Sequence, residues 1–187
     1  MRIEVHVHGS LFCCKGVTQT QVETGLRRWL EYMDVENIGE MRSLERTEPG
    51  VVYDRAERVL DICWTGEVGH SFNQCLQETL NDMGPLLARA SEVELTYYRD
   101  DDDEEGDEYQ ILFAGPSLEA IHQVQRQRML EDVSELLSRH FGPGEVAQVA
   151  AMVNHLFDQD WEQKSSQREN TASASGNLIH FRHKHLH

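Results

Sequence analysis

Hydrophobic and polar residues alternate over the first dozen positions of the chain, residues 2–12. An alternation with a period of two indicates a β-strand with one buried and one open face. We therefore predict a half-buried strand for this segment. Its apolar face carries Ile3, Val5, Val7 and Leu11, and its polar face carries Glu4, His6, His8 and Ser10.

Two later segments change to the helical period. The first follows Thr18, a suitable N-cap, and the second covers residues 72–83 before Gly84 and Pro85, which should kink or end it. In each segment the apolar side chains form one stripe, so we predict two amphipathic helices that each pack one side against a sheet. The stripe of the first helix consists of Val22, Leu26, Trp29, Leu30 and Met33.

Four short segments have the composition of strands: residues 51–53, 59–64, 93–98 and 109–113. The first of them depends on a turn at residues 48–50, and residues 66–69 should interrupt the pattern after the second. The last two should pair as a hairpin around a loop of about ten residues.

The predicted order is β-α-β-β-α-β-β, which makes the fold class α+β. The first six elements match the ferredoxin-like arrangement, an antiparallel sheet with both helices on one face. The seventh element, an extra strand, should lie beside its hairpin partner.

The period stays helical after residue 115. Ser117 is a good N-cap for a helix that should run to about His140, and residues 142–144 should end it. Residues 146–161 carry a second apolar stripe, so the two helices should form a helical hairpin. Two alternatives remain open: the hairpin packs on the sheet, or part of its stripe forms a homodimer.

These patterns predict three parts: an α+β sheet domain (1–115), the helical hairpin packed on it (116–164), and a tail (165–187). The tail is rich in Ser and Asn and ends with four histidines among its last eight residues. Its composition buries too little apolar surface to order itself, so we expect it to be flexible. Clustered histidines will retain Ni²⁺ or Zn²⁺ whether or not this binding is physiological.

Acidic residues dominate the charge of the chain, with 33 Asp and Glu against 17 Lys and Arg, a formal net charge of -16. Such a chain repels nucleic-acid backbones and anionic membrane surfaces and attracts basic protein surfaces. Eight carboxylates lie within residues 100–108, at the tip of the predicted hairpin. We predict that this tip binds a partner through Asp100, Asp101, Asp102, Asp103, Glu104, Glu105, Asp107 and Glu108.

The four cysteines show no Cys-x-x-Cys spacing, and no apolar run approaches the roughly 18–20 residues that cross a bilayer. The first residues enter the strand pattern at once, without the apolar region of a signal peptide. We therefore expect a cytoplasmic protein whose cysteines fill core or half-buried positions. A zinc site from Cys13 or Cys14 with Cys63 and a histidine is an alternative.

Residues 4–8 read Glu-Val-His-Val-His, which places His6 and His8 on one face of a strand, where they could share a metal ion. The segment resembles the opening strand of the PHP phosphoesterases, whose pattern is Asp-x-His-x-His, with Glu4 in place of the aspartate. The resemblance implies a metal-dependent phosphoesterase. It covers about ten residues, and no ordered match to that family's other metal ligands follows, so we expect no metal and no cofactor.

Two other kinds of chemistry find weaker support. An EF-hand alignment that starts at Asp101 places Leu112 where a bidentate Glu is required, and strands replace the flanking helices. Cys13 or Cys14 could act as a nucleophile with a nearby histidine, but no catalytic sequence context surrounds them. The sequence contains neither a Gly-rich phosphate loop nor a basic nucleic-acid platform.

These observations favour a non-enzymatic module that docks on a basic, nucleic-acid-binding surface of another protein. The chain resembles the small acidic proteins of bacteriophages and mobile elements, several of which inhibit host defence systems. That resemblance implies an inhibitor of a host complex. The alternatives are a homo-oligomeric structural or regulatory protein and, third, the phosphoesterase that uses His6 and His8.

Overall fold

The structure is a computed structural model that describes residues 2–98 and 106–170, with the side chains of the last helix described to residue 164. The described residues form two compact units, which divide between Ile121 and His122. The first is the sheet domain. The second holds most of the helical hairpin.

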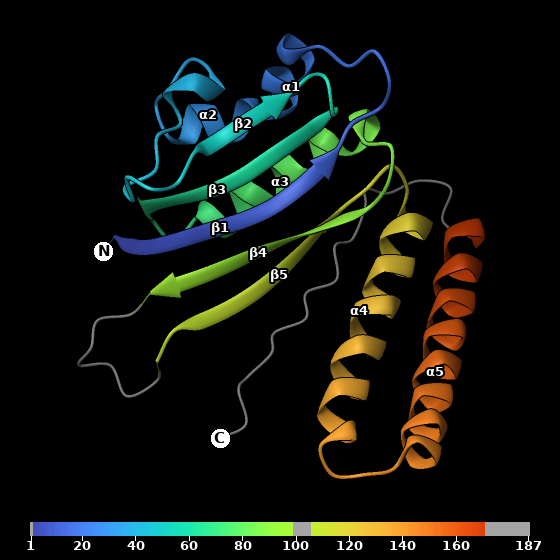
Figure 1. The fold of residues 1–187 in the computed structure, drawn as a ribbon. Coiled ribbons are helices and arrows are strands. Elements are labelled where there is room, and N and C mark those ends of the chain that lie inside the picture. The colour runs from blue at the N-terminus through green and yellow to red at the C-terminus, as the bar shows by residue number, and fades with distance from the viewer. Residues whose placement is uncertain (1, 99–105, 171–187) are drawn as a thin grey trace. The chain divides into compact units, whose positions relative to one another are not determined.

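The sheet domain is built on one antiparallel sheet of five strands in the order β2-β3-β1-β4-β5, as Figure 1 shows. The strands are β1 (Ile3–Phe12), β2 (Gly50–Asp54), β3 (Val59–Val68), β4 (Ser91–Tyr98) and β5 (Glu108–Ala114). The α+β class is confirmed, and so is each predicted strand, including the short one that became β2. Strand β1 lies in the centre of the sheet and pairs with β3 and β4.

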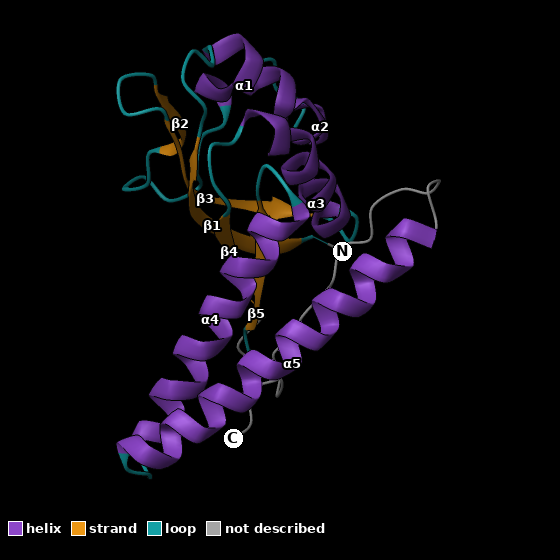
Figure 2. Cartoon of the chain, turned by 90° about the vertical axis from the view of Figure 1, so that its right-hand side faces the viewer, coloured by secondary structure: helices purple, strands orange, loops and turns teal. Residues whose placement is uncertain are grey.

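Three helices cover one face of this sheet (Figures 1 and 2): α1 (Gln19–Gly25), α2 (Arg27–Tyr32) and α3 (Phe72–Met83). Short 3-10 helices, η1 (Ile38–Glu40) and η2 (Gly84–Leu86), follow α2 and α3. Thr18 caps α1 through a capping box, because its hydroxyl accepts from the Gln21 amide while the Gln21 side chain accepts from the Thr18 amide.

The core lies between the helices and the inner face of the sheet. On β1 the alternation holds, since Val5, Val7 and Leu11 are each 0% exposed. Three aromatic rings fill the centre, with Trp29 meeting Trp64 edge-on at 5.5 Å and Phe72 at 6.1 Å between ring centroids. Large buried rings contribute most to the stability of such a core.

Two predicted boundaries were wrong. The helix after Thr18 is broken at Leu26, whose ψ near 0° separates α1 from α2. Gly25, a poor helix former, precedes the break, and a Cβ there would collide with the Met83 sulfur. Strand β3 also continues through Gly66 to Val68 instead of ending before it, because Gly66 leaves room for the Trp64 indole against the backbone.

The helical hairpin consists of α4 (Leu118–Ser138) and α5 (Pro143–Asn170). Ser117 caps α4 as predicted, since its hydroxyl accepts from the Ala120 amide at 3.1 Å. Helix α5 extends beyond residue 165, where the sequence pattern places the start of the tail. The remaining tail, residues 171–187, lies outside the described part of the chain.

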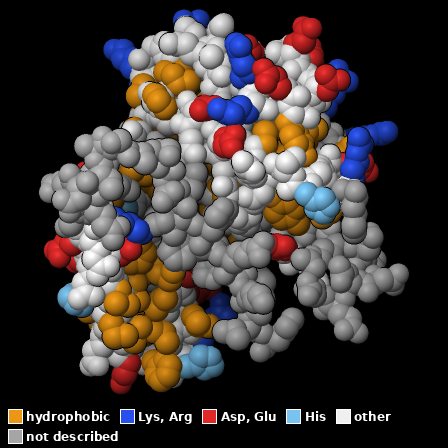
Figure 3. Space-filling view, turned by 180° about the vertical axis from the view of Figure 1, so that it is seen from behind, with side chains coloured by type: hydrophobic (Ala, Val, Ile, Leu, Met, Phe, Trp, Pro, Cys, Tyr) orange, Lys and Arg blue, Asp and Glu red, His pale blue; other side chains and the backbone are white. Residues whose placement is uncertain are grey.

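Within residues 122–164, His122 is the one described residue that is buried. Several large apolar side chains are instead more than half exposed: Leu136, Phe141, Met152 and Leu156. Figure 3 shows hydrophobic side chains gathered over this hairpin. Each helix therefore carries an apolar arc wider than its neighbouring helix covers.

Candidate functional site

The predicted docking residues fall mostly outside the described part of the chain, which omits Asp100, Asp101, Asp102, Asp103, Glu104 and Glu105. Asp107 is exposed just before β5, and Glu108 is half-buried at its first position. Strands β4 and β5 flank the acidic run and pair with each other. The flanking strands bear out the argument against an EF-hand, which requires a helix on each side.

The sheet face opposite the helices carries polar rows that run across the strands. At the end next to the acidic run, Glu4 lies opposite Glu67 on one side and Tyr98 on the other. One row further in, His6 lies opposite Thr65 and Thr96. Residues directly opposite each other in a sheet share a face, so each row is a line of adjacent side chains.

Carboxylates from separate segments converge on Tyr98, whose side chain is 40% exposed. Burial raises the pKa of the Tyr98 phenol, and the nearby charges of Asp107, Glu4, Glu48 and Glu45 raise it further. We call Glu4, Glu45, Glu67 and Asp107, all exposed, the acidic end of the sheet. Arg2 lies 3.6 Å from Glu67, but both groups are exposed and such a pair is weak.

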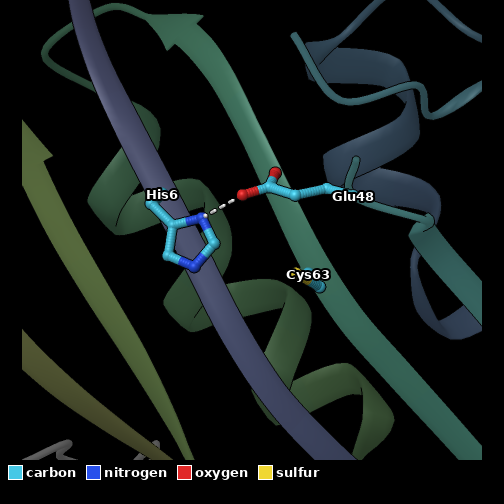
Figure 4. Close-up of side chains that lie close together, drawn as sticks. All are labelled: His6, Glu48 and Cys63. Atoms are coloured by element: carbon cyan, nitrogen blue, oxygen red, sulfur yellow. Dashed lines mark ion pairs between the residues drawn. The ribbon is translucent and has the colours of Figure 1, made fainter. Parts of the chain in front are cut away.

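A second group of side chains lies one row inward on the same face. The Nδ1 atom of His6 is 3.2 Å from Oε1 of Glu48, and Cys63 of β3 lies beside them, as Figure 4 shows. The His6 nitrogen, a Glu48 oxygen and the Cys63 sulfur all lie within 4.8 Å of one another. The three residues come from β1, from the loop before β2 and from β3. We call them the His6–Glu48–Cys63 cluster.

Hydroxyl groups hold the Glu48 carboxylate in place. Its Oε2 atom accepts from Ser43 at 2.5 Å and from Thr65 at 3.0 Å. The loop is itself fixed on β3, since the Thr65 amide donates to Ser43 and the Leu44 amide donates to the Thr65 carbonyl. Glu48 therefore reaches the open face from an anchored loop.

Neither Cys63 nor Cys13 is activated as a nucleophile. Burial raises the pKa of the Cys63 thiol, and the charge of Glu48 raises it further. Burial raises the pKa of Cys13 as well, followed by the effect of Cys14. A raised pKa keeps the thiol protonated and therefore poorly nucleophilic near neutral pH. With a protonated thiol, the cluster offers potential ligand atoms rather than a reactive nucleophile.

The alternative zinc site of Cys13 or Cys14 with Cys63 and a histidine does not come together in the structure. His8 is the residue opposite Cys63, and Cys13 lies five positions further along the strand direction, roughly 16 Å away at about 3.3 Å per residue. The shared face of His6 and His8 is confirmed, because their rings are stacked with centroids 6.2 Å apart. His6 is half-buried and His8 is exposed.

The sequence does not identify Glu48 as a site residue, because its position before Pro49 is typical of a turn. No local pattern marks it, because it meets His6 only after β3 has paired with β1 and the loop has closed over β3. The pairing of His8 with Cys63 follows from the register of two strands, which a single sequence does not specify.

His122 is the polar residue enclosed in the helical hairpin. Its ring lies 5.2 Å from that of Phe157 and 4.9 Å from that of Trp161, between centroids. Burial lowers the pKa of His122, although Asp160, 3.8 Å away, acts in the opposite direction. The ring is 6% exposed and is neutral at physiological pH. His122 therefore acts as a packing residue, and its burial makes protonation of the ring unfavourable.

Known proteins offer a match to this chain, a family of unknown function. Among the described residues, no helix combines the length and the apolar character that a membrane span requires. No curated protein and no solved structure matches the chain. A protein family does match, over residues 3–158. Since this match covers most of the chain, the protein belongs to the family of unknown function DUF6806.

Proposed function

We propose that this protein is a non-enzymatic binding module that docks on a basic surface of a partner protein. Its binding surface is the acidic end of the sheet together with the adjoining acidic run, residues 100–108. A basic surface of this kind commonly binds nucleic acid, so the carboxylates compete with phosphates for the same Arg and Lys side chains. This competition is the inhibitory mechanism that we propose for a phage-type protein in the cytoplasm.

The convergence of carboxylates on Tyr98 is the observation that supports this proposal most directly. Burial raises the pKa of this partly exposed phenol, and four carboxylates from β1, the loop before β2 and the residue before β5 raise it further. The same end of the sheet leads into the run that holds eight carboxylates in residues 100–108. An exposed tyrosine within such a field suits a docking surface, because tyrosine is enriched at protein interfaces.

The scaffold supports the same proposal. The strand order β2-β3-β1-β4 and the placement of α1–α3 on one face lead us to infer a ferredoxin-like arrangement, extended at one edge by β5. The polar face remains opposite the helices. The raised pKa of the Cys63 thiol on this face argues against nucleophilic catalysis there.

One charge variant tests the proposal. Asp100, Asp101, Asp102 and Asp103 are replaced by Ser and Asn in the full chain, which relieves repulsion between neighbouring carboxylates. The matched control replaces four exposed carboxylates elsewhere, Glu31, Glu36, Glu57 and Glu131, by Gln. Proteins captured from a bacterial lysate at low and high salt are identified by mass spectrometry, and each variant is then titrated against the captured protein.

We expect the tip variant to keep or raise the melting temperature and to weaken binding by a salt-dependent factor. The control variant should bind as the unchanged chain does, and added DNA should compete for the captured protein. Equal loss of binding in both variants would mean that binding depends on the net charge of the chain and not on this surface. Unchanged binding of the tip variant at low ionic strength would overturn the docking surface.

A second candidate function, a homo-oligomeric regulatory protein, rests on the helical hairpin. Between Leu136 and Phe157 the sequence contains one Arg and one Glu, Arg139 and Glu145, so this stretch has no net charge in a chain of net charge -16. Its exposed apolar side chains include Leu136, Met152 and Leu156. Two copies can approach here without the repulsion that the rest of the surface imposes. A second copy of the chain is therefore the occupant that we propose, as a four-helix bundle.

Sedimentation equilibrium of the full chain tests this association. We expect a dimer that the substitutions Leu136→Ser and Leu156→Ser dissociate together, because they replace apolar contacts between copies by hydroxyls. Val52, which is 43% exposed on β2, provides the control substitution Val52→Ser. A monomer at the highest soluble concentration, at low and at high salt, would exclude the dimer.

A further inference from the structure

We propose that His6, Glu48 and Cys63, with His8 as fourth ligand, bind a single Zn²⁺ ion on the open face of the sheet. The proposal does not depend on the docking function, although Glu48 also adds to the negative charge around Tyr98. The sequence led us to expect no metal, because the pair of His6 and His8 was assessed without Glu48 and Cys63 beside it.

The donor set fits zinc. A thiolate, an imidazole nitrogen and a carboxylate oxygen are the three ligand types that Zn²⁺ takes in proteins, at about 2.0–2.3 Å. In a tetrahedral site such ligand atoms are about 3.5 Å apart. The three atoms of the cluster already lie within 4.8 Å of one another, so rotations of side chains suffice to close the site.

His8 is placed to complete four ligands. It lies directly opposite Cys63 in the β1–β3 register, and its ring is stacked on that of His6 at 6.2 Å. Opposite residues on one face have Cβ atoms about 4.5–5.5 Å apart, within reach of a shared ion. Since four protein ligands close a zinc site, the ion would be structural rather than catalytic.

The surroundings resemble the outer shell of a metal site. Ser43 and Thr65 both donate to Oε2 of Glu48, which leaves Oε1 directed toward His6. Hydrogen bonds of this kind fix the orientation of a ligating carboxylate. The side chains of His6 and Glu48 are 23% and 16% exposed, so an ion there would be partly shielded from water.

The ion pair of His6 with Glu48 accounts for these two residues but not for Cys63. Among the described residues, the Cys63 thiol has no hydrogen-bond partner, although it lies beside a carboxylate. A Zn²⁺ ion bound to the thiolate and the carboxylate balances two negative charges with two positive ones. It would also tie the loop before β2 to both β1 and β3.

Cobalt is the probe that separates this site from the tail. Co²⁺ substitutes for Zn²⁺, and only cobalt bound to a thiolate gives the sulfur-to-metal charge-transfer band in the near ultraviolet. The tail, residues 171–187, contains four histidines but no cysteine, so it cannot produce that band. The full reduced chain is titrated with Co²⁺ and then with Zn²⁺ as competitor, while circular dichroism confirms the fold of every variant.

We expect one Co²⁺ per chain with the charge-transfer band, displaced by Zn²⁺. Cys63→Ser should abolish the band, and Thr65→Val should weaken Zn²⁺ binding by about 10-fold through the outer shell. Cys75→Ser, a half-buried cysteine on α3, is the matched control and should leave the titration unchanged. Absence of the band in the unchanged folded chain, or its persistence in Cys63→Ser, would overturn the proposal.

Discussion

The sheet domain and the helical hairpin use apolar residues in opposite ways. In the sheet domain, Trp29, Trp64 and Phe72 are each at most 1% exposed and contact one another. In the hairpin, Leu136 is 59% exposed and Met152 is 61% exposed. The first unit has a closed core of its own. The second has apolar surface in excess of what two helices can bury, and its one buried described residue is a histidine.

Both units contain ion pairs between helices, but they differ in what else holds the helices together. The hairpin links its helices through Arg126, which donates to Asn154 at 2.6 Å and to Asp158 at 2.7 Å. The Arg126 side chain is 24% exposed, whereas that of Asp158 is 58% exposed, so solvent weakens the attraction. In the sheet domain, Arg28 of α2 contacts Glu78 and Asp82 of α3 in a comparable way, but that unit also has ring packing and strand pairing. We conclude that the hairpin is the part whose stability depends most on solution conditions and on partners.

The largest expected effect tests this difference between the two units at the aromatic core. Phe72→Ala should lower the free energy of unfolding of the sheet domain by about 3–5 kcal/mol, since a fully buried ring leaves a cavity. Phe141→Ala is the matched change in the hairpin, where the ring is 55% exposed, and should cost less than about 0.5 kcal/mol. Urea denaturation followed by circular dichroism compares the two. Similar losses would refute the contrast.

An effect of intermediate size concerns pH. Burial lowers the pKa of His122 below its ordinary value of 6.5. Its contribution to stability is therefore present above that ordinary value and is lost as the pH falls through the lowered pKa. Between about pH 7.5 and pH 5, the hairpin should lose stability, and His122→Phe should remove part of that loss.

Urea titrations at both pH values measure this dependence. Trp161 fluorescence reports on the hairpin in a background that carries Trp29→Phe and Trp64→Phe, and this background is used if it remains folded. The exposed His140 provides the control His140→Gln. If His122→Phe keeps the full dependence on pH, the buried histidine is not its source.

The smallest effect compares two helix caps. Thr18→Ala removes the capping box of α1, and Ser117→Ala removes the hydroxyl that accepts from Ala120 in α4. Each should cost about 1 kcal/mol. For Thr18 we expect the loss in the cooperative unfolding of the sheet domain. For Ser117 we expect it as faster amide hydrogen exchange in the first turn of α4. The reverse distribution would contradict the contrast.

The sequence predicted what local patterns determine. The alternation around Val5 and Val7 placed β1 and its buried face, and the strand composition on both sides of the acidic run placed the β4–β5 hairpin. The break at Leu26 and the continuation of β3 through Gly66 depend on contacts with Met83 and Trp64, which exist only in the folded chain. The same limit applies to the site, since His6 was visible as half of a histidine pair whereas Glu48 was not.

The central position of β1 has a consequence for how the chain folds. Its two neighbours, β3 and β4, follow it in sequence by nearly sixty and nearly ninety residues, as the pairing of Val7 with Trp64 and with Leu95 shows. Contacts of such sequence separation slow folding, because a long loop must close before they form. During synthesis, one edge of β1 therefore stays unpaired until β3 has left the ribosome and the other until β4 has followed, so the sheet is completed from its centre outward.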